Sequence, residues 1–230
     1  MKKCIIVGGA DIHNYDLIRE RIHADDFLIF CDSGLKHLHD LRVKPSLIVG
    51  DFDSHENPML DVETIVLPRE KDDTDTVYGV KEGLKRGWDN FLLIGVVGGR
   101  LDHTLGNVSI LLYLDSLGKK GCILDDDSEM EIVSDQPVPV SDNFSFFSLL
   151  NITGTARGIC VTGAKYPLTD AEITCEYQYG ISNEVLAGET AVVSVKCGKL
   201  LLIKIFGEPS RLPESSSGLP NCTQKKGTSN

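Results

Sequence analysis

The residues from Ile48 to Ser54 place two carboxylates directly after an apolar run. The sequence there is Ile-Val-Gly-Asp-Phe-Asp-Ser, so one residue separates Asp51 from Asp53. Alternate side chains of an extended segment point to the same face, which would bring the two carboxylates together. Mg²⁺ prefers hard oxygen ligands of this kind and commonly bridges them to phosphate. The segment therefore predicts a divalent metal site beside a phosphate group.

Asp75 and Asp102 are two further carboxylates, and each lies at or near the start of an expected helix. A carboxylate is favoured at a helix start, so capping explains either residue taken singly. Four carboxylates concentrated in one crevice are nevertheless costly unless a cation lies among them. We therefore favour one metal site formed by Asp51, Asp53, Asp75 and Asp102 over separate caps.

Gly98 and Gly99 precede Arg100, a combination suited to phosphate. Glycines let backbone N–H groups approach a phosphate closely, and the arginine fork can neutralise charge that a metal does not. His103 is interpreted as a hydrogen-bonding residue of the helix start rather than as a catalytic base. The glycine pair at Gly8-Gly9 lacks G-x-G-x-x-G spacing, which disfavours a dinucleotide-binding oxidoreductase.

The amino-terminal half alternates short apolar runs with helical patterns, as a parallel sheet covered by helices does. A helix is expected from Asp75 to Gly87 and another from Asp102 to Gly118, because apolar residues recur there at helical spacing. The expected strands are Cys4–Val7, Phe27–Cys31, Leu47–Val49, Thr64–Leu67, Phe91–Val97 and Cys122–Leu124.

Each of these strands ends in polar or glycine residues. The carboxyl ends of parallel strands meet at one edge of a sheet, and open sheets bind ligands there. We therefore expect one crevice, although a solvated turn explains the last of these segments better than a second metal cluster does. The segments are Gly8-Gly9, Asp32-Ser33-Gly34, Asp51 with Asp53, Arg69–Asp75, Gly98-Gly99-Arg100 and Asp125–Asp127.

The carboxyl-terminal half changes to strand after strand, which predicts an antiparallel β-sandwich. Its expected strands, which follow a linker at Asp135–Pro139, are Phe144–Leu150, Gly158–Thr162, Ala191–Lys196 and Leu200–Phe206. The expected fold is α/β, a Rossmann-like parallel sheet domain followed by this sandwich. We place the α/β nucleotide-binding domain at 1–128, the β domain at 129–206, and a disordered tail of low apolar content at 207–230.

Composition excludes several classes of protein. The chain has 230 residues, 41% of them apolar, which suffices for real cores, and no apolar run is long enough for a membrane helix. A net charge of −11 disfavours a nucleic-acid binder. Seven scattered cysteines without a CxxC pair argue against disulfides and zinc. Together with the absence of a signal peptide, this predicts a cytoplasmic protein.

Taken in order, the motifs resemble the thiamine pyrophosphokinase family over about residues 3 to 205. The resemblance implies Mg²⁺-dependent transfer of a pyrophosphoryl group from ATP to thiamine, which gives thiamine diphosphate and AMP. It also implies a homodimer whose active site lies at the subunit interface. The motifs are Asp32-Ser33-Gly34, Gly50–Ser54, Lys71–Asp75, Gly98–His103, Gly163–Leu168 and Ile181-Ser182-Asn183.

Transferred residue by residue, the resemblance implies that Asp51, Asp53, Asp75 and Asp102 are the catalytic and metal-binding carboxylates. Ser182 and Asn183 match the thiamine-side motif. Many members of the family carry tryptophan in the segment where this chain has Tyr166, so an aromatic ring is kept. The implied ATP and phosphate residues are Asp32, Lys71, Thr74, Gly98, Gly99 and Arg100.

Two other classes of protein stay open from the residues alone. A Mg²⁺-dependent phosphohydrolase or glycosyltransferase would use the same aspartate pair after a strand, but it would not explain Ile181-Ser182-Asn183. A non-catalytic binding module for nucleotide or thiamine would keep Arg100 and the glycines while tolerating loss of the carboxylates. All four carboxylates are present.

Overall fold

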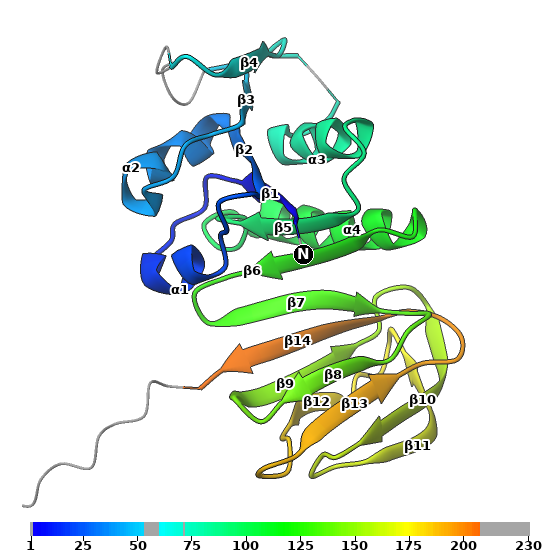
Figure 1. Cartoon of the computed structure of the whole chain (residues 1–230). Coiled ribbons are helices and arrows are strands. Elements are labelled where there is room, and N and C mark those ends of the chain that lie inside the picture. The colour runs from blue at the N-terminus through cyan, green and yellow to red at the C-terminus, as the bar shows by residue number, and fades with distance from the viewer. Residues whose placement is uncertain (1, 53–59, 71, 208–230) are drawn as a thin grey trace, which may run out of the picture.

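The computed structural model describes residues 2–52, 60–70 and 72–207. Asp53, Lys71 and the segment 208–230 of the expected tail lie outside the described residues. Within the described part, the chain forms a ten-stranded sheet, a separate four-stranded sheet and helices on both faces of the first (Figure 1). The fold is thus α/β in its first half and antiparallel β in its second, as expected.

The first half of the large sheet is parallel throughout. Its strands lie in the order β6-β5-β1-β2-β3-β4 and all pair in parallel, so their carboxyl ends meet at one edge as predicted. The strands are β1 (Cys4–Val7), β2 (Phe27–Cys31), β3 (Leu47–Gly50), β4 (Glu63–Val66), β5 (Asn90–Ile94) and β6 (Lys120–Leu124).

Helices cover both faces of this parallel half, because alternate strand residues are apolar on both sides. Cys4 and Ile6 of β1 join one buried cluster with α3 (Asp75–Lys85) and α4 (Leu101–Ser116). Ile5 and Val7 of β1 join another with α1 (Tyr15–Glu20), the 3₁₀ helix η1 (Asp32–His37) and α2 (Leu38–Leu41). The helices expected after Asp75 and Asp102 are therefore confirmed.

The second half extends the same sheet with antiparallel strands. β6 pairs with β7, and the order continues β7-β14-β9-β12, while a second sheet in the order β11-β10-β13-β8 packs against this part. A third buried cluster, including Phe147 and Val193, lies between the two sheets. The strands are β7 (Ser128–Val133), β8 (Val138–Ser141), β9 (Phe144–Leu150), β10 (Thr155–Thr162), β11 (Leu168–Thr174), β12 (Gly180–Asn183), β13 (Thr190–Ser194) and β14 (Leu200–Phe206).

The expected linker at Asp135–Pro139 has a different role from the one predicted. It holds the turn after β7 and the first residues of β8, so it connects the large sheet to the small one. The two halves instead meet where β6 pairs with β7, with Ile123 opposite Met130. Backbone hydrogen bonds of one continuous sheet therefore join them.

A buried charge cluster stabilises the strands at this junction. Lys204 of β14, whose side chain is only 8% exposed, contacts Glu129 and lies 2.7 Å from Glu131, both on β7. Arg21, which caps α1, reaches Glu129 at 3.2 Å and so ties that helix to the antiparallel strands. The two glutamates raise the pKa of Lys204 against the opposing effect of burial, so the lysine stays charged.

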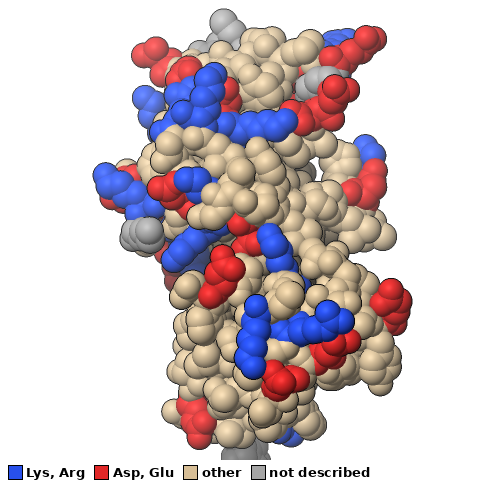
Figure 2. Space-filling model, turned by 90° about the vertical axis from the view of Figure 1, so that its right-hand side faces the viewer, with Lys and Arg blue, Asp and Glu red and all other residues tan. Residues whose placement is uncertain are grey.

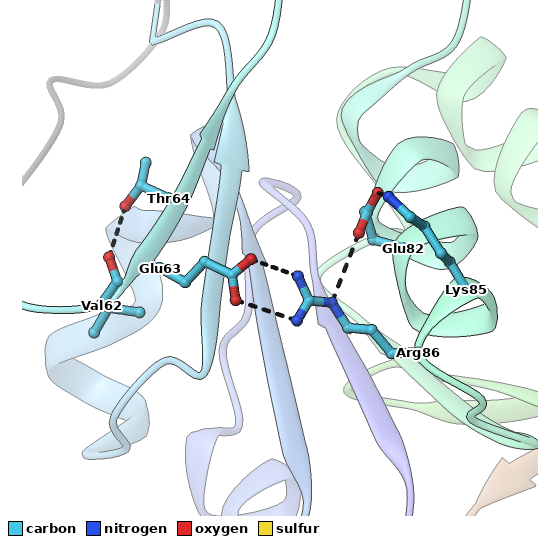
Figure 3. A network of polar contacts seen from close by, with 6 residues as sticks. All are labelled: Val62, Glu63, Thr64, Glu82, Lys85 and Arg86. Carbon is cyan, nitrogen blue, oxygen red and sulfur yellow. Dashed lines mark hydrogen bonds and ion pairs between the residues drawn. The ribbon is translucent and has the colours of Figure 1, made fainter.

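A second ionic network fixes α3 on the sheet (Figure 3). Arg86 forks onto Glu63 of β4 with N–O distances of 2.6 and 3.1 Å, and its Nε lies 3.6 Å from Glu82 of α3. Its guanidinium also stacks over Phe27 of β2. Because Arg86 follows the last residue of α3, these contacts attach the carboxyl-terminal end of the helix that begins at Asp75 to β4 and β2.

The surface carries both charge signs side by side. Figure 2 shows basic and acidic side chains interspersed over the face in view. Such mixing contrasts with the single-sign stripe of a nucleic-acid interface. Within the described residues, the longest and most apolar helices fall short of what a membrane span requires.

Replacing Lys204 with methionine is expected to destabilise the fold strongly. The change leaves the half-buried Glu131 without its cation and the buried Glu129 with Arg21 alone, and removing one partner of a buried pair costs about 3 kcal/mol or more. Urea unfolding monitored by circular dichroism measures the difference. Lys2→Met is the control, because the Lys2 side chain is 65% exposed and its pairing with Asp25 is worth little. Equal stabilities for Lys204→Met and the unmodified protein would contradict the role given to this cluster.

Candidate functional site

Three aspartates from three separate elements converge at the carboxyl edge of the parallel strands. Asp32 begins η1 directly after β2, Asp51 follows β3, and Asp75 is the first residue of α3. One carboxylate oxygen from each lies within 4.8 Å of the other two. Asp32 is buried and the other two are half-buried. Three hard oxygen donors this close are a suitable ligand set for a divalent cation.

This cluster shares two members with the set of four predicted from the sequence. Asp51 and Asp75 are brought together as expected, while Asp53 lies outside the described residues. Asp102 is not part of the cluster found among the described residues. Asp32, which the resemblance implies as an ATP- or phosphate-binding residue, is the third member of the cluster. The signal for Asp32 was available, since it follows a buried strand in the same way as Asp51.

The backbone around Asp51 is shaped to let the carboxylates approach. A methyl group on Gly50 would lie 2.5 Å from the Cβ of Asp32, so only glycine lets β3 end this close to η1. Phe52 has φ of 56°, in the left-handed region that costs a non-glycine residue about 1 kcal/mol or more. The expected extended conformation of residues 51–53 is therefore wrong at Phe52, and the chain turns immediately after Asp51.

A pocket of about 330 Å³ opens beside the carboxylates. Loops after β1, β2 and β5 line it together with the start of α3, so several strand ends share one crevice. Asp75 belongs to both the pocket and the carboxylate cluster. Thr74 caps α3 by accepting a hydrogen bond from the Val77 N–H at 3.3 Å. The amino-terminal end of a helix, which attracts anions, therefore borders the pocket.

The diglycine loop after β5 forms another wall of the pocket. Gly98 and Gly99 have φ of 97° and 64°, conformations that glycine adopts without strain. The Thr104 hydroxyl accepts from the Gly98 N–H at 3.1 Å and donates to the Arg100 carbonyl at 3.2 Å, which holds the loop against α4. The loop thus presents backbone and Arg100 to the pocket in a fixed shape.

Asp102 pairs with Arg100 in the described structure. Arg100 Nε donates to its carboxylate at 3.1 Å, and both side chains are exposed. This hydrogen bond from Arg100 lowers the pKa of Asp102 to about 2, so the carboxylate is ionised at neutral pH. Asp102 therefore forms an exposed ion pair with Arg100, and Arg100 lines the pocket.

Of three further pocket residues, His103 was set aside and Asn107 was missed by sequence reasoning, while Ser33 was named only within the Asp32-Ser33-Gly34 segment. Ser33 follows Asp32 into the pocket, and His103 lines the wall made by α4. Asn107 is buried and donates from Nδ2 to the Val96 carbonyl at 2.8 Å. His103 and Asn107 lie four residues apart on α4, so helical spacing from the diglycine motif could have found Asn107.

The residues matched to the thiamine motif lie far from this pocket. Asn183 of β12 accepts from the Tyr166 N–H at 3.0 Å and donates to the Tyr166 carbonyl at 2.8 Å. Its amide therefore fixes the loop that carries the exposed Tyr166 ring. Ser182 has φ of 58°, another left-handed non-glycine residue. A small cavity of about 60 Å³ lies here, lined by Tyr166, Asn183 and Ile181 among others.

Comparison with known proteins matches both halves of the chain. Residues 18–123 match the family described as thiamin pyrophosphokinase, catalytic domain, and residues 129–200 match thiamin pyrophosphokinase, vitamin B1 binding domain. Thiamine pyrophosphokinase of Bacillus subtilis (strain 168) is 28% identical over 181 residues, which cover 75% of this chain and 84% of that protein.

Solved structures agree with the sequence match. The crystal structure of thiamine pyrophosphokinase from Bacillus subtilis superposes with a TM-score of 0.77 at 25% identity, covering 90% of this chain and 99% of that one. The enzyme from Geobacillus thermodenitrificans also gives 0.77, at 26% identity, covering 92% of this chain and 100% of that one. The similarity therefore extends over both sheets.

Asp75→Asn is expected to weaken binding of Mn²⁺, used as a probe of the carboxylate cluster, by about tenfold or more. The substitution removes one charged oxygen donor and no core volume, so the melting temperature should be maintained. Calorimetric titration without nucleotide measures the affinity. Asp73→Asn is the matched control, since Asp73 pairs with Lys81 outside the cluster. Asp102→Asn should also bind Mn²⁺ normally; a loss there with none in Asp75→Asn would contradict the assignment.

Proposed function

The chain belongs to the thiamin pyrophosphokinase family, and from this premise we propose that it transfers a pyrophosphoryl group from ATP to thiamine in the presence of Mg²⁺. The products are thiamine diphosphate and AMP. The observation that carries the proposal is the position of Asp75, which lines the pocket and is also a member of the carboxylate cluster. A triphosphate bound in the pocket would therefore lie next to a divalent cation bound by the carboxylate cluster.

The donor set fits the proposed metal. Asp32, Asp51 and Asp75 offer hard oxygen ligands, and Asp53 is proposed as a further ligand from the sequence. Mg²⁺ held there would neutralise phosphate charge and make the β-phosphorus more electrophilic. We propose that Asp102 pairs with Arg100 and is not a metal ligand, because its carboxylate already accepts a hydrogen bond from Arg100.

The protein's own groups position the reactants. Gly98 and Gly99 offer backbone close to the phosphates, and Arg100 is placed to neutralise their remaining charge. Thr74 at the start of α3 is proposed to contact the phosphates. Lys71 is proposed to contact them as well, on the basis of the sequence alone. Asp75 is the candidate acceptor of the thiamine hydroxyl proton, because its carboxylate lies at the pocket wall. Little covalent chemistry is asked of the protein, so alignment and charge supply most of the rate.

The distance between the thiamine-motif residues and the carboxylate cluster supports a homodimer. Ser182 and Asn183 lie on β12, which is eight inter-strand steps from β3 in the large sheet. At about 4.8 Å per step this separates them by roughly 38 Å, too far for one thiamine to reach both. We propose that the β domain at 129–206 of one subunit presents thiamine to the α/β domain at 1–128 of the other.

The surface around Ser182 suits both a ring-shaped ligand and a partner subunit. Tyr166, Tyr179 and Ile181 are 58%, 42% and 56% exposed, an unusual set of apolar side chains for a free surface. Aromatic rings of this kind can stack on a planar cationic ring such as that of thiamine. A cytoplasmic location is proposed with the reaction, since the described cysteines are free thiols.

The proposed reaction is tested by incubating the purified protein with ATP, Mg²⁺ and thiamine. We expect thiamine diphosphate and AMP to appear in equal amounts, and no AMP to appear when thiamine or the divalent cation is left out. Chromatography of the nucleotides distinguishes AMP from ADP. Release of ADP, or ATP turnover that ignores thiamine, would show that the chain catalyses another phosphoryl transfer.

A further inference from the structure

The loop that follows β1 lines the same pocket as the diglycine loop. Gly8, Gly9 and Ala10 line the pocket with their backbone. The Gly8 N–H donates to the Ile94 carbonyl at 2.9 Å and the Ala10 N–H donates to the Gly95 carbonyl at 2.8 Å. These bonds fasten one side of the loop to the end of β5. The position of its other side is set by groups that the proposed chemistry does not use.

His37, the last residue of η1, holds that other side. Its side chain is buried, and Nε2 lies 2.8 Å from the Ala10 carbonyl oxygen. A carbonyl oxygen only accepts, so Nε2 carries the proton and donates. The hydroxyl of Tyr15 lies 2.8 Å from Nδ1 and donates to it, because the second nitrogen of this neutral tautomer is an acceptor. Tyr15 therefore fixes both the tautomer and the ring orientation.

The same short helix carries residues of the carboxylate cluster and of the pocket. Asp32 and Ser33 begin η1, and His37 ends it. A methyl group on Gly9 would lie 2.0 Å from Ser33 Oγ, so the loop backbone rests directly on this helix. The loop and η1 therefore touch at several points, among them Gly9 on Ser33, Ala10 on His37, and Gly8 beside Gly34. Any shift of the loop relative to Asp32 has to break one of them.

We propose that His37, oriented by Tyr15, is a positioning residue that sets the Gly8–Ala10 loop in register with the carboxylate cluster so that the loop fits the phosphates of ATP. The inference rests on the proposed function for the identity of the ligand. In this proposal one short helix, η1, positions both Asp32, a proposed metal ligand, and the loop that faces the nucleotide. Neither His37 nor Tyr15 contacts the reacting atoms.

The environment of His37 keeps the ring in the state that this role requires. Burial lowers its pKa and Lys36 acts in the same direction, while the hydrogen bond to the Ala10 carbonyl and the nearby Asp11 and Asp40 act in the opposite direction without reversing the shift. The neutral ring, with one donor and one acceptor nitrogen, is therefore the form present at neutral pH. That form matches both hydrogen bonds without rearrangement.

The test compares three variants with one control. His37→Leu removes the bond to Ala10, and Tyr15→Phe removes the group that orients the ring. His37→Gln restores a donor that can reach the Ala10 carbonyl. Leu41→Ala is the control, because Leu41 is fully buried in the same apolar cluster and makes no side-chain hydrogen bond to the loop. Melting temperatures are recorded for all four variants to compare their folding.

For His37→Leu we expect KM for ATP to rise about fivefold to tenfold, the size of effect that one net hydrogen bond supports, with KM for thiamine unchanged. Tyr15→Phe should give a smaller rise, and His37→Gln should recover most of the loss. Leu41→Ala should lower the melting temperature without changing KM for ATP. Equal effects on both substrates, or a Leu41→Ala variant that behaves like His37→Leu, would reduce His37 to a structural core residue and overturn the proposal.

Binding of Mg·ATP without thiamine separates this inference from the proposed function. If the protein makes no thiamine diphosphate but binds Mg·ATP, weaker binding in His37→Leu with recovery in His37→Gln would still support the positioning role. If catalysis is as proposed and His37→Leu binds Mg·ATP as tightly as the unmodified protein, the proposed function stands and the role of His37 is refuted. Absence of Mg·ATP binding in the unmodified protein would overturn both.

Discussion

The close approach of three carboxylates at the ends of β2 and β3 and the start of α3 is the constraint on which the rest of the site depends. The carboxylate oxygens lie within 4.8 Å of one another, and two ionised carboxylates at that limit would repel by roughly 3 kcal/mol at an effective dielectric constant of about 20, before any partner or cation is counted. The fold sustains this because each aspartate is attached to a different rigid element. Gly50 lets β3 end against Asp32, and the Arg86 network holds α3 on the sheet, so none of the three can relax away cheaply.

The same edge of the sheet supplies the surrounding pocket. Parallel strands direct their carboxyl ends to one side of the sheet. Short connections are therefore enough to bring together the loops after β1, β2 and β5 and the start of α3. The antiparallel strands continue this sheet beyond β6, which makes the two halves one structural unit. It also places β12 far from the carboxylates, and this separation is the physical reason for assigning thiamine capture to a second subunit.

Sequence patterns predicted the strands and the polar strand ends well, because buried parallel strands are continuous apolar runs. They predicted the antiparallel half less completely. β7 carries Glu129 and Glu131 at alternate positions, which interrupt its apolar pattern, and both glutamates pair with Lys204 of β14. β11 is an edge strand in which Leu168, Ala171 and Ile173 are separated by polar residues, so its apolar pattern is weak. Asp32 could have been preferred to Asp102 from the sequence, because it follows a buried strand as Asp51 does, but only the fold shows that its carboxylate lies beside those of Asp51 and Asp75.

The central claim is that the carboxylate cluster and the glycine-lined pocket form a single site for a metal-bound triphosphate. Anomalous diffraction from crystals grown with Mn²⁺ and a non-hydrolysable ATP analogue tests it most directly. The account predicts a manganese peak among Asp32, Asp51 and Asp75, with a phosphate oxygen of the pocket-bound analogue as a further ligand. A peak at Asp102 with none among these three aspartates, or an analogue bound outside the pocket, would contradict it.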